Sequence, residues 1–408
     1  MRLLRFSFES CMHNRKTTIL NLLICMITVI LMNVYAGNLI HNQEQLAKLP
    51  EVMEIPAFVT NLCGNMDSIL HIKLKQVDGV LNSEYVRDPV ITARLKIGFG
   101  EFAPEDYFEN LKYYVTGSNS IAGIPGLKPE ELTFQDESYR DTFWGSDERI
   151  CIIDENLLRQ KNMKIGDMIE ITSYNYRYEA YHMIYIDPLE CSTYKIIGSM
   201  NINEYIGTSI KPDIVFPLGT VRKLFDENGV EFFADSCSFK VKDPFKLNEF
   251  KQEMHDIGFL PVAYAAEYQY DGNALTVKDE TFVHSAEQLM NNQKLLLLLL
   301  PFLCFVVLCI GFVIAVLLMK GRTAEYAIMR SLGQTHRESL YQLCLGYAMV
   351  AVAGSLLGII VSLILLKTAL YILLLTAFAF LIFYIVGTIA ALSSLKKLSV
   401  MSVLSKND

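Results

Sequence analysis

The sequence lacks the motifs that mark common catalytic sites. It contains no G-x-x-x-x-G-K-[ST] phosphate loop, so the chain itself is not expected to hydrolyse ATP. Its seven histidines form no H-x-x-x-H or H-E-x-x-H pair, and no serine lies in a G-x-S-x-G turn. These absences argue against metal catalysis and against a serine nucleophile. We therefore expect no enzyme, no catalytic residue, no metal ligand and no bound cofactor.

Charged residues are absent from four long apolar runs, at residues 17–40, 295–319, 341–366 and 370–392. About 20 apolar residues suffice for a helix that spans a bilayer. Apart from Lys367, in the short turn between the last two runs, we find no charged residue within the span region, which disfavours a secondary transporter with a polar site at the midplane. The first run is too long for a signal peptide and lacks a clean cleavage site, so we expect a retained anchor.

Paired cysteine motifs are also missing. The nine cysteines include no C-x-x-C pair. Four of them fall between the first and second apolar runs: Cys63, Cys151, Cys191 and Cys237. These four cysteines can form one or two disulfides or remain free thiols, and the sequence does not decide between the two, because a large domain does not need disulfides.

Charge is distributed unevenly. Residues 41–293 hold 40 Asp and Glu against 23 Lys and Arg, whereas residues 1–16, 320–340 and 393–408 together hold 11 basic and 4 acidic residues. Short loops rich in Lys and Arg stay in the cytoplasm. We therefore predict a polytopic α-helical membrane protein in a one-plus-three arrangement, with both termini cytoplasmic and a large mixed α/β extracytoplasmic domain.

The parts outside the spans have distinct patterns. Residues 1–16 predict either an amphipathic helix at the inner headgroups or an unstructured basic flank, and residues 393–408 form a cytoplasmic tail. The first helix is expected to continue to about Leu49. Residues 41–293 predict a split α/β subdomain with a β-rich subdomain inserted at about 113–215.

Residues 320–340 form a basic segment between the second and third spans. Ala324, Ala327, Ile328 and Ser331 follow helical spacing, and Gly333 stands where a left-handed helix stop is needed. Thr335 and Glu338 have the spacing of a capping box, which predicts the start of another helix. In the third span, Gly354-x-x-x-Gly358 predicts close packing between spans, with a dimer face as the alternative.

This segment resembles the cytoplasmic coupling segment of the FtsX-like permease family, the membrane subunits of ABC transporters of the MacB and LolC kind. The family pattern R-x-x-E-x-x-x-x-R-x-x-G is matched by Arg322, Glu325, Arg330 and Gly333. Residues 149–198 resemble the family's periplasmic core domain, with a strand, a helix, a Gly166-Asp167 turn and further strands. The tail departs from the family because it lacks a proline near Met401 and an arginine after Leu404.

The resemblance implies a permease of the bacterial plasma membrane that transmits movement from a separate cytoplasmic ABC ATPase, which binds the ATP, to the outer domain. It implies export or extraction of an amphiphilic substrate such as a peptide, drug, lipid or lipoprotein. The alternative is a signalling subunit that activates an extracellular hydrolase.

Implied partners are the ATPase, a second copy or paralogous permease, membrane lipids, and an extracytoplasmic adaptor or hydrolase, but no nucleic acid. The residues expected to couple to the ATPase are Arg322, Glu325, Ala327, Ile328, Arg330, Ser331 and Gly333.

Overall fold

The computed structural model describes residues 15–179, 183–202, 210–263, 272–331, 333–366 and 369–394. The chain divides into two compact units. The helical unit comprises Met1–Leu49 and His284–Asp408, and the barrel unit comprises Pro50–Val283. Most of the predicted N-terminal segment 1–16, most of the tail 393–408, and Lys367 lie outside the described residues.

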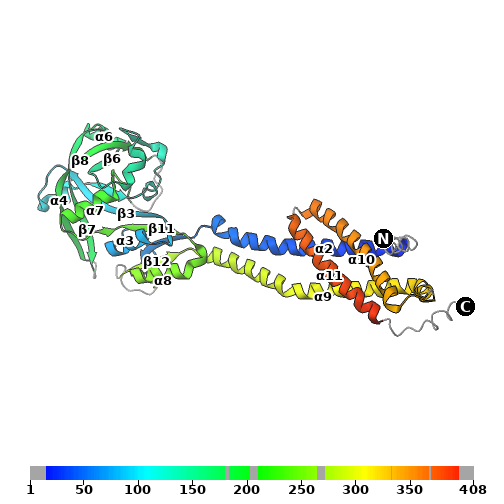
Figure 1. Cartoon of the computed structure of the whole chain (residues 1–408). Coiled ribbons are helices and arrows are strands. Elements are labelled where there is room, and N and C mark those ends of the chain that lie inside the picture. Colours follow the sequence, from blue (N-terminus) through cyan, green and yellow to red (C-terminus); the bar gives the residue numbers. More distant parts are fainter. Residues whose placement is uncertain are drawn as a thin grey trace. The chain divides into compact units, whose positions relative to one another are not determined.

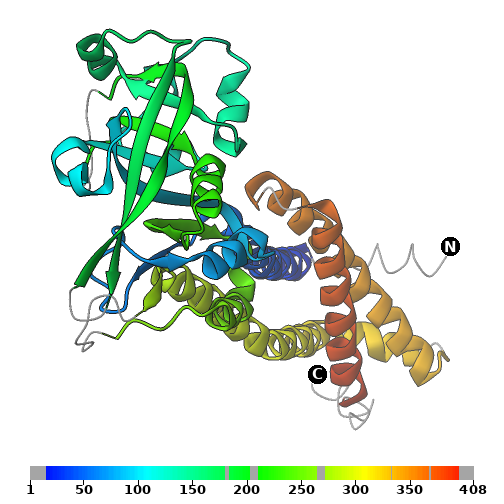
Figure 2. The ribbon, with the colours of Figure 1, turned by 90° about the vertical axis from the view of Figure 1, so that its left-hand side faces the viewer.

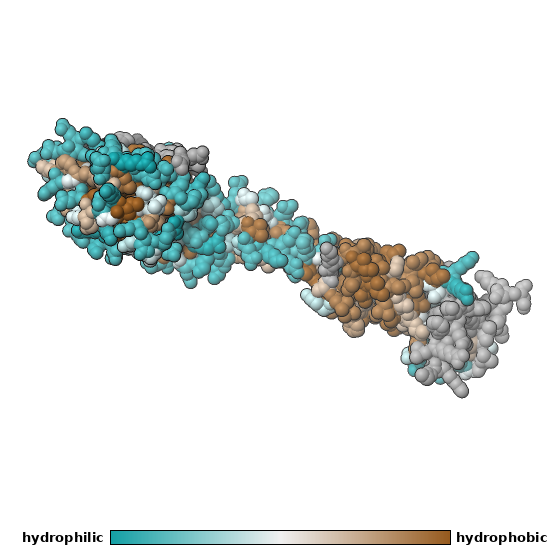
Figure 3. Space-filling model, turned by 90° about the horizontal axis from the view of Figure 1, so that it is seen from above, coloured by the Kyte–Doolittle hydropathy of each residue, from teal (hydrophilic) through white to brown (hydrophobic). Residues whose placement is uncertain are grey.

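Within the described residues, four helices are long and apolar enough to cross a membrane, as predicted: α2 (Arg15–Val52), α9 (Glu280–Ser331), α10 (His336–Leu366) and α11 (Leu370–Ser394). Figure 1 labels them, and Figure 3 shows the hydrophobic side chains on the surface of their apolar stretches. Insertion into a membrane stays a prediction.

Two of these helices continue well beyond their apolar runs. At 1.5 Å per residue, the 38 residues of α2 extend about 57 Å and the 52 residues of α9 about 78 Å, against a hydrocarbon core of about 30 Å. Helix α9 does not end at Met319, where the predicted span ended, but continues to Ser331. Residues 320–331 contain no proline and only one glycine, so nothing in them interrupts the hydrogen-bond ladder.

Glycines allow the four helices to approach closely. A Cβ on Gly354 or Gly358 of α10 would lie 2.8–2.9 Å from side-chain atoms of Cys25 or Val29 on α2. The G-x-x-x-G pattern therefore packs within the chain, which confirms the prediction of packing between spans. A second close approach was not predicted: Gly387 of α11 lies against the backbone of α9 at Leu308.

Buried polar side chains also join these helices. The Asn33 amide of α2 donates to the Ser362 hydroxyl of α10 at 2.9 Å and accepts from the Thr376 hydroxyl of α11. The Tyr384 hydroxyl of α11 donates to the Asn21 amide oxygen of α2 at 3.1 Å. Uncharged hydrogen bonds of this kind hold helices together in apolar surroundings. Helix α2 thus has polar contacts with both α10 and α11.

The barrel unit contains a closed ring of six strands: β3 (Val86–Phe99), β4 (Tyr113–Ser118), β9 (Ile214–Pro217), β6 (Ile150–Asp154), β8 (Met183–Met200) and β7 (Met168–Glu179). Each strand pairs with the next, and β7 pairs back to β3. Figure 2 shows the long β7–β8 pair in green. The sequence predicted a mixed α/β domain but not this closure.

Further strands extend the barrel sheet. Strand β11 (Ser236–Val241) pairs with β3, β1 (Pro56–Asn61) with β11, β12 (Asn273–Val277) with β1, and β5 (Leu132–Phe134) with β8. A separate pair joins β2 (Ile72–Lys73) and β10 (Phe233–Ala234). The remaining helices are α3 (Leu74–Asn82), α4 (Tyr107–Asn110), α5 (Tyr139–Thr142), α6 (Glu155–Lys161), α7 (Leu218–Glu227) and α8 (Leu247–Ile257).

The segment that resembled the family's outer domain folds as its local pattern predicts. Strand β6, helix α6, the turn at Gly166 (φ +104°) and strand β7 follow in the expected order. Asp154 caps α6 by accepting a hydrogen bond from the Asn156 amide at 2.9 Å. Apolar residues of β5, β6, β8 and β9, together with Phe143, form a buried core on this part of the barrel.

The contact between α11 and α9 makes a specific prediction. Gly387→Ala places a Cβ about 2.3 Å from the Leu308 carbonyl oxygen, so the two helices must separate. We expect a loss of about 1–3 kcal/mol in stability, as for overpacking of a core. Thermal unfolding in detergent, followed with a thiol-reactive dye, measures it. Gly145→Ala, which meets no atom within 4 Å, is the control. Equal unfolding midpoints for Gly387→Ala and the unmodified chain would contradict the prediction.

Candidate functional site

The seven predicted coupling residues lie on the last turns of α9 or in the corner that follows: Arg322, Glu325, Ala327, Ile328, Arg330, Ser331 and Gly333. Only the backbone of the first four is described. Arg330 is half-buried and Ser331 is exposed. The structure thus brings all seven positions into one helix end and its corner.

Two other residues show which side of this helix end faces the helical unit. Met329 is buried, and Tyr326, one turn earlier, packs against the core of the unit. With 3.6 residues per turn, positions 324, 327, 328 and 331 lie on the opposite side of the helix. Ser331 is exposed, as this geometry requires. The helical backbone therefore places these four positions, the predicted docking face, on the side of α9 opposite Met329 and Tyr326.

The corner after α9 is a Schellman motif. The Gly333 amide donates to the Arg330 carbonyl and the Gln334 amide to the Met329 carbonyl, both at 3.2 Å. Gly333 has a φ of +91°, a left-handed conformation. A Cβ there would meet no atom within 4 Å, so backbone strain alone makes this position a glycine. The predicted helix stop is confirmed.

The start of α10 is a capping box. The Thr335 amide donates to the Glu338 carboxylate at 2.9 Å, and the Glu338 amide donates to the Thr335 hydroxyl at 3.3 Å. The buried Ser339 hydroxyl donates to the Thr335 carbonyl at 3.2 Å. Arg330 also closes the corner, since its guanidinium donates to the Gln334 carbonyl at 2.9 Å. Side chains therefore fix the corner, and it is not a loose loop.

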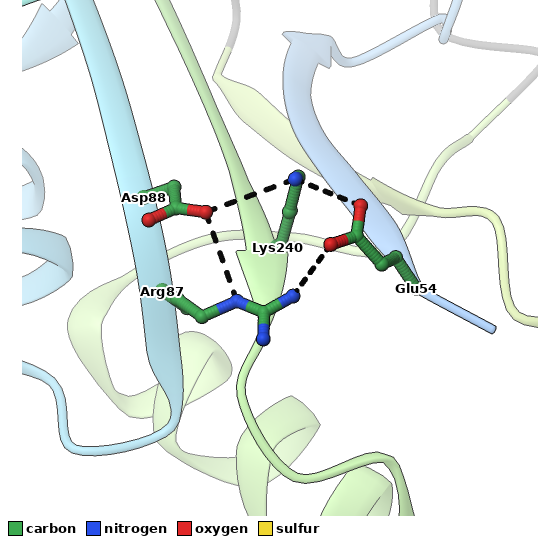
Figure 4. A network of polar contacts seen from close by, with 4 residues as sticks. All are labelled: Glu54, Arg87, Asp88 and Lys240. Carbon is green, nitrogen blue, oxygen red and sulfur yellow. Dashed lines mark hydrogen bonds and ion pairs between the residues drawn. The ribbon is translucent and has the colours of Figure 1, made fainter. Parts of the chain in front are cut away.

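In the barrel unit, an ionic network holds the segment just after α2. Glu54 pairs with Arg87 of β3 at 2.8 Å and with Lys240 of β11 at 2.7 Å. Asp88 lies 3.7 Å from both cations (Figure 4). The hydrogen bond from Lys240, together with the charge of both cations, lowers the pKa of Glu54. The network attaches the end of α2 to two strands of the sheet.

A second set of contacts holds the start of α9 within the barrel unit. Lys251 of α8 pairs with Asp279 at 2.7 Å, and the ring of Phe245 packs edge-on against that of Phe282, with centroids 5.8 Å apart. Phe282 is buried. Sequence reasoning missed both anchors, because their partners are separated by 28 or more residues and no local pattern relates them.

The described residues include no group of three or more His, Cys, Asp or Glu that could hold a metal ion. Cys63, Cys151, Cys191 and Cys237 are not joined by disulfides in the structure. Burial raises the pKa of Cys237 to about 12 and also raises the pKa of Cys151, so neither thiol is readily ionised. The candidate functional groups of the described residues lie in three places: the corner after α9, the two anchors, and the cavities of the barrel unit.

Replacement of Gly333 tests the corner. Gly333→Val forces a β-branched side chain into a left-handed conformation, at a cost of roughly 1 kcal/mol or more. In membrane vesicles whose corner side is accessible to protease, we expect trypsin to cleave this variant at Arg330 or Arg337 faster than it cleaves the unmodified chain. Gly333→Asn, which tolerates this conformation, is the matched control and should resemble the unmodified chain. Cleavage at the same rate in all three proteins would show that the corner does not depend on glycine.

No protein-family model and no curated protein matches this chain. The resemblance to the FtsX-like permease family rests on residues within the chain, above all the spacing of Arg322, Glu325, Arg330 and Gly333.

Proposed function

We propose that the chain is the membrane subunit of an ABC transporter in a bacterial plasma membrane. In this function, a separate cytoplasmic ATPase binds the predicted docking face at the end of α9. Movement of that helix then changes the conformation of the barrel unit on the other side of the membrane. Both termini are cytoplasmic, and the ATP is bound by the partner.

The observation that carries the proposal is the continuity of α9. One helix runs from Glu280 to Ser331, with the predicted docking face at one end. At its other end the barrel unit holds it through Lys251 and Asp279. Pro301 removes one backbone donor within α9, but the chain is helical on both sides of it. We infer that a displacement at one end of this continuous helix is passed along its length.

Helix α2 supports the proposal in the same way. It runs without interruption from Arg15 to Val52, and Glu54 then attaches the chain to β3 and β11. Two stiff helices therefore enter the barrel unit, each with its own anchor. A relative movement of α2 and α9 would act on two different parts of that unit.

The proposed substrate class is supported by the polar residues buried in the described spans, which are uncharged. Asn33 bonds to Ser362 of another helix, whereas Thr28 and Thr388 donate to backbone carbonyls of their own helices. They are not arranged around an ion or a charged substrate. We therefore propose export or extraction of an amphiphilic molecule by the barrel unit, without passage of a charged substrate between the helices.

Replacement of Ile328 tests the docking face. Ile328→Asp places a charge in the proposed contact, where it is costly if enclosed. We expect the tagged variant to reach the membrane at the normal level but to recover at least about tenfold less of the ATPase, a loss of about 1.4 kcal/mol or more in binding. The measurement is pull-down from native membranes, with the recovered chain identified by mass spectrometry and by its ATP hydrolysis.

Met168→Asp is the control for the added charge, because Met168 is 62% exposed on the barrel unit. It should recover the ATPase like the unmodified chain. Unchanged recovery with Ile328→Asp at normal expression would remove the end of α9 from the proposed contact. Robust ATP hydrolysis by the purified chain alone would overturn the proposed function as a whole.

A further inference from the structure

Two neighbouring cavities lie in the barrel unit beside β3. The smaller has a volume of about 180 Å³ and the larger of about 270 Å³. Three residues line both: Arg94, Ile210 and Asp235. An ion pair, Arg94 with Asp235 at 2.9 Å, therefore lies at the junction of the two cavities. The site is separate from the helix end proposed to bind an ATPase.

The smaller cavity has an excess of positive charge. Both oxygens of Asp235 are engaged, one by Arg94 and the other by the Ile69 amide at 3.1 Å. Lys96 also lines the cavity; among the described residues it has no carboxylate partner and lies 5.6 Å from the centre of the Tyr114 ring. Burial raises the pKa of Asp235, and the charge of Arg94 opposes this rise. Protonation of Asp235 would make the cavity more positive.

The remaining walls are apolar or aromatic. They are formed by Ile69, Leu70, His71, Leu95, Tyr114, Ile210 and Phe233. The rings of His71 and Phe233 lie 5.4 Å apart. A cavity of about 150 Å³ accommodates one benzene ring, so the smaller cavity has room for one ring with a small charged group. Few convergent polar groups in an apolar surround are typical of a ligand site.

Two strained or unsatisfied groups lie on the same cavity wall. The Asn175 side-chain nitrogen is buried and has no hydrogen-bond partner among the described residues, a state that an acceptor brought close by a ligand would relieve. Ile69 has a φ of +58°, a conformation that β-branched residues rarely adopt. Asp235 holds it there through the Ile69 amide. Strain of this kind gathers at ligand sites.

We propose that this cavity binds a small organic monoanion, a carboxylate attached to one aromatic or compact apolar group. The carboxylate lies between Lys96 and the free edge of the Arg94 guanidinium, and the apolar group lies against Phe233 and Leu70. The carboxylate belongs either to a free small molecule or to the C-terminal residue of a peptide, because both present the same chemistry.

The test uses the full chain in nanodiscs and 4-fluorobenzoate observed by ¹⁹F NMR. We expect saturable line broadening with a Kd between about 10 µM and about 1 mM, as suits a ligand of this size. The neutral 4-fluorobenzamide should bind at least about tenfold more weakly because it lacks the charge. A short peptide with a C-terminal phenylalanine, and the same peptide as its amide, distinguish the two sources by competition.

Two variants locate the site. Lys96→Gln removes a charge that has no carboxylate partner in the described part of the chain, so it should leave the fold intact and weaken the binding of 4-fluorobenzoate at least about tenfold. Arg94→Gln combined with Asp235→Asn replaces the ion pair with an amide pair, leaves no uncompensated charge, and should weaken binding similarly. The control is Lys164→Gln, an exposed lysine of the barrel unit that lines neither cavity, which should bind normally.

Absence of saturable binding to the unmodified chain would overturn the proposal. So would equal binding of the acid and the amide, or equal affinity in the unmodified chain and both cavity variants. None of these outcomes bears on the recovery of an ATPase by the end of α9, so this inference and the proposed function can fail separately.

Discussion

A helix that crosses a membrane must satisfy its backbone hydrogen bonds within itself, and this constraint applies to the proposed spans of the helical unit. Helix α9 stays helical over 52 residues, with one backbone donor missing at Pro301, and α2 is helical over 38 residues. Both helices continue beyond their apolar runs. Where α9 does end, the carbonyls of Met329 and Arg330 are satisfied by the amides of the corner. The same constraint thus gives both the stiffness of the helices and the sharp corner between them.

The contacts around these helices act together. Gly354 and Gly358 bring α10 onto α2, Gly387 brings α11 onto α9, and Asn33 bonds to both α10 and α11. Close backbone contact and polar bonds are what hold helices together when apolar surfaces are not driven together by water. In the barrel unit the anchors at Glu54 and Asp279 are ionic instead, as suits a hydrated surface.

Local features were predictable from the sequence, whereas features built from distant residues were not. The four apolar helices, the Gly333 corner, the Thr335 cap and the β6–α6–β7 order each depend on residues close in the chain. Barrel closure requires β3 to pair with β4 and also with β7, and no periodicity specifies those partners. Arg94 and Asp235 are 141 residues apart, so the cavity that they line could not be predicted from the sequence either.

The central claim is that movement begun at the end of α9 is transmitted along α2 and α9. The most direct measurement is the distance between spin labels at the exposed positions Glu44 of α2 and Gln288 of α9, in the complex with its ATPase. The account predicts that the distance distribution shifts when ATP binds and returns after hydrolysis. An unchanged distribution in a complex that hydrolyses ATP normally would contradict it.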